Sequence, residues 1–305
     1  MRPAPLLGIA GLSTRTLHLS RGTMTVLDSD PEGVRGGGRR PVLFVHGFGR
    51  GSLQLAPLAL VFRHSGRVLV PDLFDLGGRS ASRAGSTDVI HHAESLDELC
   101  IALGVDAVDV VGISFGGWVG AWLAIRAPQR VARLFLVNPA GVRARSEELA
   151  ELYRTADSDD ALYRRVVSGP PFVGVPVVSR LLERAFMRTL TDPSIARFLE
   201  TVDDEHFVDE SLDRIRCETF LLLGAADELL DLRATAALFR SRVPGVRGKW
   251  VEGGSHNLGY EAFEVLCEEL AAFLGTGRLP ARSRVLGLAR HLKVPPRTFD
   301  LEGAP

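Results

Sequence analysis

The 305-residue sequence contains few cysteines, almost no lysine, almost no net charge and no long hydrophobic run. Its three cysteines, Cys100, Cys217 and Cys267, are too few and too scattered for a disulfide framework, and no two have the spacing of a metal site. The 36 basic and 37 acidic residues leave a formal net charge of -1, so no overall field selects a polyanion and we expect no nucleic-acid partner. Only Lys249 and Lys293 are lysines, which indicates a bias in composition rather than a role that needs arginine.

Apolar stretches end before they reach the length that a membrane span or a secretion signal needs. The run at residues 5–12 is shorter than the apolar core of a signal peptide, and no small-residue cleavage site follows it. Elsewhere an arginine or an acidic residue interrupts each apolar segment short of the roughly 20 residues that cross a bilayer. The sequence therefore predicts no integral membrane segment, and the scattered cysteines favour a reducing, cytoplasmic location.

The apolar runs that are present have the length and order of a parallel sheet. Residues 14–18 and 23–27 predict two short strands joined by a turn, which together form an antiparallel hairpin. Further strand-length runs, with helical patterns between most of them, occupy residues 41–45, 67–70, 108–113, 131–137, 219–223 and 249–251. This alternation predicts an α/β fold with a mostly parallel, doubly wound sheet.

The alternation is interrupted once, after the sixth predicted strand. Residues 141–216 change to charged amphipathic helices, near 147–154 and 162–167, which predicts a helical cap inserted into a core of residues 1–140 and 217–275. Apolar residues of this insert, Phe172 among them, either cover a site or pack the insert onto the sheet. The sequence favours neither role.

Residues 276–305 differ in character from the core and form a basic C-terminal extension that contains four prolines. Residues 285–292 have the apolar spacing of an amphipathic helix. A basic helix of this kind usually docks on its own protein, and a peripheral contact with an anionic membrane stays open as an alternative.

The sequence G-x-S-x-G at residues 112–116 is the pattern of a nucleophile elbow. In such an elbow a serine sits on a strained turn between a strand and a helix, and its hydroxyl projects from the edge of the sheet. A single match means little in a chain with 32 glycines. Here a buried strand pattern precedes the motif and an apolar helical pattern follows it, so Ser114 is the predicted nucleophile.

A serine hydroxyl is protonated at neutral pH, so it needs a general base, and the base needs an orienting acid. Asp227 lies just past one apolar strand, and His256 lies in a glycine-rich loop after the last predicted strand. Both positions are where open α/β sheets build their sites, which predicts Asp227 as acid and His256 as base. Glu228 and Asp231 share the loop of Asp227 but also suit capping of the next helix. Asn138, at the end of the strand before the insert, cannot carry the charge that an acid needs.

The turn after the strand at residues 41–45 predicts a site for a developing negative charge. It begins with His46-Gly47-Phe48, and the backbone N–H of Phe48, with that of Phe115 in the elbow, is the predicted oxyanion hole. Each such donor stabilises a transition state by about 2.7–4 kcal/mol. His46 orients this loop by hydrogen bonding in our interpretation and is not a base.

These motifs together resemble those of the α/β-hydrolase superfamily over about residues 14–274. The resemblance makes Ser114, Asp227 and His256 the family's nucleophile, acid and base, in the family's chain order. Residues 138–141, Asn-Pro-Ala-Gly, are similar to those of monoacylglycerol lipase-like esterases and of meta-cleavage product hydrolases. One departure lies at residues 74–76, Phe-Asp-Leu, where members of the family usually have a Pro-Gly-aromatic turn.

The complete ordered set predicts a serine hydrolase that cleaves a small-molecule carboxylic ester and needs neither a metal nor another cofactor. Phe48, Phe115 and the apolar insert favour an apolar acyl group, and Gly47, Trp118 and Phe172 are the predicted substrate contacts. A carbon–carbon bond hydrolase of the meta-cleavage type would use the same serine, acid and base. A ligand-binding member of the fold without turnover is a third alternative, because fold alone does not fix function. The sequence indicates no oligomeric state.

Overall fold

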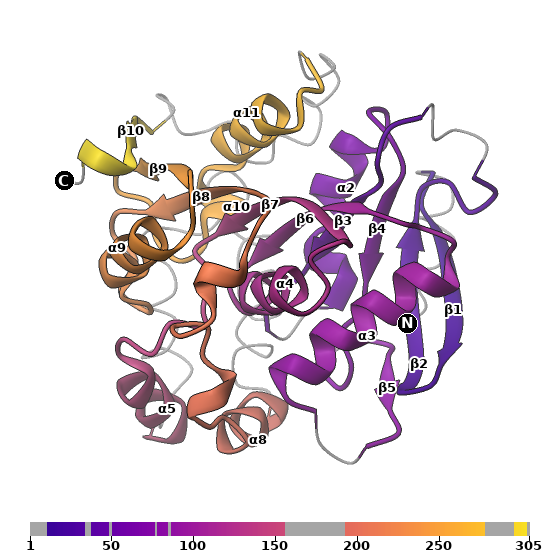
Figure 1. Cartoon of the computed structure of the whole chain (residues 1–305), viewed down its shortest axis with the longest axis horizontal. Coiled ribbons are helices and arrows are strands. Elements are labelled where there is room, and N and C mark those ends of the chain that lie inside the picture. Colours follow the sequence, from indigo (N-terminus) through magenta and orange to yellow (C-terminus); the bar gives the residue numbers. More distant parts are fainter. Residues whose placement is uncertain are drawn as a thin grey trace, which may run out of the picture.

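The computed structural model describes residues 11–33, 38–48, 51–76, 78–84, 87–155, 193–277 and 296–303 (Figure 1). In these residues ten strands form one sheet in the order β1-β2-β4-β3-β6-β7-β8-β9-β10, and β5 pairs with β2. The strands are β1 (Ser13–Leu19), β2 (Gly22–Asp28), β3 (Val42–Val45), β4 (Val68–Pro71), β5 (Ala81–Ser82), β6 (Val108–Ile113), β7 (Val131–Val137), β8 (Glu218–Gly224), β9 (Arg247–Val251) and β10 (Thr298–Asp300).

The centre of the sheet is parallel, and its edges are antiparallel. The neighbours from β4 through β3, β6, β7 and β8 to β9 all pair in parallel, whereas β1, β2, β5 and β10 join by antiparallel pairing. Every residue of β3, β4 and β6 is buried, as expected for strands with helices on both faces. The predicted fold class and the predicted N-terminal hairpin are confirmed.

Helices cover the two faces of the sheet (Figure 1). Residues of α3, α4 and α9 belong to one buried apolar cluster, and residues of α2 and α11 belong to the other. The described α-helices are α2 (Ala56–Phe62), α3 (Val89–Ala102), α4 (Phe115–Arg126), α5 (Ser146–Thr155), α8 (Pro193–Glu200), α9 (Leu232–Arg242), α10 (Leu258–Glu261) and α11 (Phe263–Leu274). Short 3-10 helices are η1 (Gly51–Gln54), η2 (Asp204–His206), η3 (Leu212–Arg214) and η5 (Leu301–Gly303).

The insert between β7 and β8 contributes α5, α8, η2 and η3 among the described residues. The helix predicted near residues 147–154 is α5, and α5 packs against α8 in the lower part of Figure 1. Phe172 and the helix predicted at residues 162–167 lie outside the described residues, and so does the amphipathic helix predicted at residues 285–292. The division into core, cap and extension stays a prediction.

Part of the C-terminal extension joins the sheet, which the sequence analysis did not anticipate. Strand β10 runs antiparallel to β9, with Thr298 opposite Val251, and the N–H of Glu252 donates to the carbonyl of Arg297 at 2.9 Å. Leu301, directly after β10, is buried in the larger apolar cluster. These residues therefore cover the edge of β9 just before the loop that carries His256.

No helix in the described part of the chain is long and apolar enough to cross a membrane.

Candidate active site

Ser114 lies on the sharp turn between β6 and α4 that its motif predicts. Its backbone has φ 54° and ψ -119°, a conformation that a residue with a side chain adopts only at a cost. The turn is tightly packed, because a Cβ atom at Gly116 would overlap the carbonyl oxygen of Val45. The N–H of Ser114 donates to the carbonyl of Val137 at 2.9 Å, so the end of β7 holds the turn in place.

The three residues predicted as nucleophile, base and acid form one hydrogen-bonded chain. His256 Nε2 lies 2.8 Å from Ser114 Oγ, and His256 Nδ1 lies 2.7 Å from Asp227 Oδ2. One tautomer satisfies both contacts: Nδ1–H donates to the carboxylate, and Nε2 accepts from the serine hydroxyl. The side chain of Asp227 is 1% exposed and that of His256 is 9% exposed. The electrostatic attraction between them is therefore weakly screened by water.

The loop after β8 presents Asp227, and not its acidic neighbours, to the histidine. Its second carboxylate oxygen accepts the N–H groups of Leu229 and Leu230 at 2.8 and 3.0 Å, which fixes the side chain. Asp231 caps α9 by accepting from the N–H of Ala234, as the sequence suggested, and Glu228 is exposed. Only one carboxylate of this loop therefore reaches His256 in the described structure.

One predicted oxyanion donor, Phe115, lies in the elbow, and the other, Phe48, lies in the turn after β3. Phe115 is the first residue of α4, so its N–H has no acceptor inside the helix and is available to a ligand. Phe48 follows Gly47, and a Cβ atom at Gly47 would lie 3.4 Å from that of Ser114. The N–H of Gly47 donates to Gln54 Oε1 at 3.0 Å and is therefore occupied, so the amide of Phe48 stays the predicted donor of this turn.

His46 holds the oxyanion loop from behind, in agreement with our interpretation of the sequence. It is fully buried, with Nδ1 2.6 Å from the carbonyl of Gly47, while Nε2 accepts the N–H of Leu73 at 2.9 Å. Burial lowers the pKa of His46 below its usual value, so the ring is neutral and has one donor and one acceptor. Gln54 and Leu73 each hold this loop through one hydrogen bond, to partners seven and 27 residues away in the sequence, and no sequence pattern signals either bond.

An aromatic cluster lies between the elbow, the oxyanion loop and the insert. The rings of Phe48 and Phe115 stack with centroids 4.4 Å apart, and Phe198 of α8 approaches both edge-on at 5.3 and 4.8 Å. Trp118, a predicted substrate contact, is 4% exposed and stacks on Phe207. Trp118 therefore packs between Phe115 and Phe207 of the insert, and its role as a substrate contact stays a prediction.

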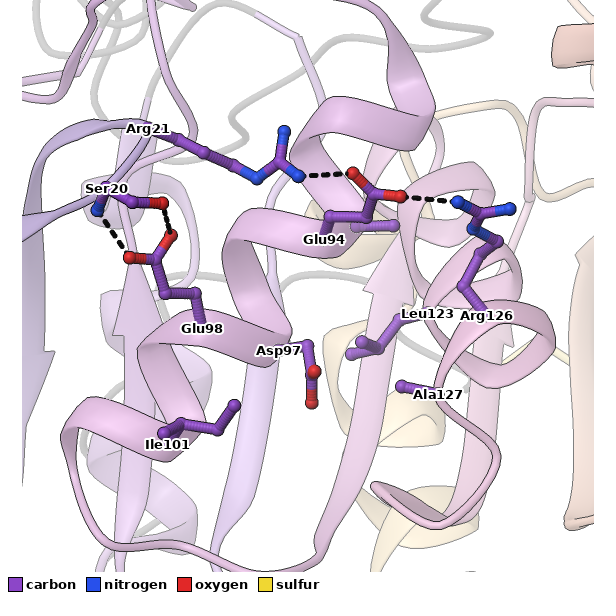
Figure 2. Close-up of a pocket in the computed structure, with 10 residues that line it drawn as sticks. Ser20, Arg21, Glu94, Asp97, Glu98, Ile101, Leu123, Arg126 and Ala127 are labelled. Carbon is purple, nitrogen blue, oxygen red and sulfur yellow. Dashed lines mark hydrogen bonds and ion pairs between the residues drawn. The ribbon is translucent and has the colours of Figure 1, made fainter.

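A hollow elsewhere on the surface has charged side chains at half of its lining positions (Figure 2). It lies between the β1–β2 turn, α3 and the carboxyl end of α4, a helix length of about 18 Å from Ser114. Figure 2 shows Glu94 between Arg21 and Arg126, with both ion pairs at 2.6 Å. The other acidic lining residues are paired too, Asp97 with Arg130 and Glu98 with Ser20. Each acidic side chain that lines the hollow therefore already has a partner within the protein, and Ser114 remains the candidate active site.

The described residues include no group of three or more histidine, cysteine or acidic side chains that could hold a metal ion. The site at Ser114 brings together the serine, the histidine and the buried carboxylate, beside the predicted backbone donors. Such a set can generate a serine nucleophile, move its proton and stabilise an anion.

Residues 40–263 match the protein family described as alpha/beta hydrolase fold. This chain belongs to that family. Within it, a 2-hydroxy-6-oxo-2,4-heptadienoate hydrolase of Pseudomonas putida is 28% identical over 243 residues, which cover 71% of this chain and 84% of that protein. A 2-hydroxymuconate semialdehyde hydrolase of a Pseudomonas species is 39% identical over 108 residues, 33% of this chain and 37% of that protein.

This α/β hydrolase spans only 32% to 43% of the length of the first curated relatives that it matches. The solved structure of a membrane phospholipase A, a bacterial virulence factor, superposes with a TM-score of 0.73 at 25% identity, and the match covers 88% of each chain. Family and structural neighbours agree on a hydrolase fold.

Proposed function

We propose that this α/β hydrolase cleaves carboxylic esters through an acyl-enzyme on Ser114. The observation that supports the proposal is the position of His256, within hydrogen-bonding distance of both Ser114 and Asp227. A nucleophile, a base that touches it and an acid that orients the base are the minimum for this chemistry.

In the proposed reaction, Ser114 Oγ attacks the ester carbonyl carbon while its proton passes to His256 Nε2. Asp227 stabilises the imidazolium, and the N–H groups of Phe48 and Phe115 bind the negative oxygen of the tetrahedral intermediate. Collapse of the intermediate breaks the bond to the alcohol, which leaves with the proton from His256. A water molecule then gives a proton to His256 and attacks the acyl group. The acid is released, and Ser114 regains its proton.

The aromatic surroundings of the site support an apolar acyl group. Phe48, Phe115 and Phe198 bring three rings together beside the elbow, and Trp118 extends this wall. Apolar and aromatic walls with a few polar groups are typical of sites for apolar small molecules. A measured preference for charged, strongly polar esters would overturn this part of the proposal.

A second candidate function is the hydrolysis of a carbon–carbon bond next to a ketone. Two relatives support it, since one is a 2-hydroxymuconate semialdehyde hydrolase and the other a 2-hydroxy-6-oxo-2,4-heptadienoate hydrolase. In that reaction water supplies the hydroxyl of the new acid and the proton of the carbon fragment. The same serine, histidine and aspartate would serve.

The deciding experiment compares the rates at which the protein hydrolyses two kinds of substrate. One is a series of p-nitrophenyl esters from acetate to laurate. The other is 2-hydroxy-6-oxo-2,4-heptadienoate, whose cleavage is followed by its loss of absorbance. Wild type is measured beside Ser114→Ala and beside Ser241→Ala, an exposed serine on α9. Ester turnover that only Ser114→Ala abolishes supports the esterase. Faster turnover of the dienoate favours the second candidate, and no turnover of either substrate favours a binding protein.

We further propose a small-molecule substrate and a cytoplasmic location for this protein. All three cysteines are free, and burial raises the pKa of Cys100 and Cys267 to about 12, which makes both thiols unreactive. Free thiols suit a reducing compartment. Fractionation of cells that express the chain would test the location.

A further inference from the structure

The end of β7 and the turn after it contact the chain at or shortly before each of the three candidate catalytic residues. The carbonyl of Val137 accepts the N–H of Ser114 at 2.9 Å, and the N–H of Ala140 donates to the carbonyl of Ser114 at 3.1 Å. Between them lies Asn138, whose own N–H donates to Leu222 of β8 at 3.1 Å. This short turn therefore meets both the elbow and the strand that leads to Asp227.

The side chain of Asn138 links the loop of the acid to the loop of the base. Its Oδ1 accepts the N–H of Gly224 at 2.8 Å, and its Nδ2 donates to the carbonyl of Ser255 at 2.9 Å. Gly224 is the last residue of β8, three positions before Asp227, and Ser255 directly precedes His256. One amide group thus spans the two loops whose side chains must meet.

The position accepts few other side chains. Asn138 is fully buried, and its φ of 41° lies in the left-handed region, which asparagine tolerates better than most residues with a side chain. Its amide supplies one acceptor and one donor in opposite directions. Aspartate has the same shape but offers no N–H, so it would set a carboxylate oxygen against the carbonyl of Ser255.

The loop of His256 has a second anchor on its other side. The N–H and the hydroxyl of Ser255 donate to the two carboxylate oxygens of Glu261 at 3.0 and 2.7 Å. Glu261 lies on α10, after the histidine, so this pair ties the loop to its own continuation. The contact with Asn138 ties Ser255 across the sheet to the end of β7, and the N–H of Ala226 donates to the carbonyl of Gly254 at 2.9 Å as a second link between the two loops.

We propose that Asn138 is a positioning residue, which sets the distance of His256 from Asp227 and from Ser114. It touches no substrate atom in this role and acts through the backbone of two loops. The inference rests on the proposed function of the triad. Because catalytic groups need their geometry held within about 0.5 Å, loss of this link should affect the rate more than the binding of substrate.

The test uses the full chain with Asn138→Gly and Asn138→Asp. Glycine keeps the backbone conformation and removes both hydrogen bonds, whereas aspartate keeps the acceptor and removes the donor. Asn257→Asp is the matched control, because it places the same new charge beside His256 without touching the amide of Asn138. We expect both Asn138 variants to lower kcat about 10- to 100-fold with KM changed less than about 3-fold, as for a small misplacement of reacting groups. The control should keep at least half of the wild-type kcat.

A second readout does not depend on turnover. Proton NMR detects the far-downfield resonance of a histidine Nδ1–H that donates to a carboxylate, here the His256–Asp227 bond. We expect this resonance in wild type and in Asn257→Asp, and we expect it to be lost or to exchange faster with water in both Asn138 variants. If wild type hydrolyses no substrate, the proposed function fails, and the resonance still decides the role of Asn138.

Three outcomes would overturn the proposal. They are an unchanged kcat and resonance in folded Asn138→Gly, an equal loss in the Asn257→Asp control, and failure of both Asn138 variants to fold by circular dichroism. The last outcome would make Asn138 a residue of general stability. If only Asn138→Asp fails to fold, Asn138→Gly decides.

Discussion

The indole N–H groups of Trp118 and Trp122 donate to the same acceptor, the carbonyl oxygen of His206, at 2.7 and 2.6 Å. The two indoles lie one turn apart on the same side of α4, the helix that begins after Ser114. His206 belongs to η2, between α8 and β8. A carbonyl oxygen has two lone pairs and can accept both donors. The elbow helix is thereby bonded directly to the insert.

Replacing either tryptophan by phenylalanine should cost about 1 kcal/mol of unfolding free energy, the usual worth of one hydrogen bond. The double variant should lose more unfolding free energy than the two single variants together, because the buried carbonyl of His206 then loses both partners. Urea unfolding of Trp118→Phe, Trp122→Phe and the double variant measures the coupling. Trp250→Phe is the control, since its buried indole N–H has no hydrogen-bond partner in the described structure. Strict additivity of the two substitutions would contradict the shared acceptor.

Asp227→Asn should lower kcat for ester hydrolysis by about 10³- to 10⁴-fold with the fold intact. An amide cannot stabilise the imidazolium, and its N–H favours the wrong tautomer of His256. Steady-state kinetics and thermal unfolding measured on one preparation separate the two effects. Glu228→Gln neutralises an exposed acid of the same loop and should retain the wild-type rate. Equal losses of kcat in Asp227→Asn and Glu228→Gln would mean that the charge of the loop, and not the contact of Asp227 with His256, determines the rate.

His92 should make the protein less stable as the pH falls below neutrality. Burial lowers the pKa of His92 from 6.5 to about 3, with His91 and His46 nearby, and neither ring nitrogen has a hydrogen-bond partner among the described residues. Between these two values the unfolded chain binds a proton that the folded chain does not, so unfolding becomes easier at lower pH. His92→Leu removes both the proton and the unpaired nitrogens. The stability gained by this substitution should grow by about 2 kcal/mol from pH 7 to pH 5.

Urea unfolding of wild type and His92→Leu at the two pH values measures this difference. The exposed His18 serves for comparison, and His18→Gln should follow the wild-type pH dependence. If His92→Leu stabilises the protein equally at pH 7 and pH 5, the ring of His92 has the same charge in the folded and in the unfolded chain, and the prediction is wrong.

Deletion of residues 296–305 should lower the unfolding free energy by about 2–3 kcal/mol, chiefly through the lost burial of Leu301. It also uncovers the edge of β9, and an uncovered strand edge promotes association between chains. Unfolding curves and size-exclusion chromatography report the two effects. Deletion of residues 304–305 alone leaves β10 in place and should change neither. If deletion of residues 296–305 leaves the unfolding curve unchanged from wild type, β10 contributes no stability.

The sequence by itself determined the parallel centre of the sheet, the elbow at Ser114 and the chain order of Ser114, Asp227 and His256. It did so because buried parallel strands need continuous apolar runs, and because a strand-turn-helix junction needs glycines at fixed offsets. These are local requirements, so local patterns record them. Local sequence also distinguished Asp227, the predicted acid, from Asp231. Asp231 lies three residues before Ala234, whose N–H in the first turn of α9 needs an acceptor, so Asp231 suits a helix cap.

Only the tertiary structure decided which residues support the site. Asn138 and Leu73 carry no pattern of their own, because each bonds to groups that are distant in sequence and adjacent only after folding. Strands β5 and β10 have two and three residues, too few for any periodicity, and they form because a neighbouring strand offers an unpaired edge. Short-range residue preferences fix the elements, whereas the distances between loops from separate strands are fixed by packing.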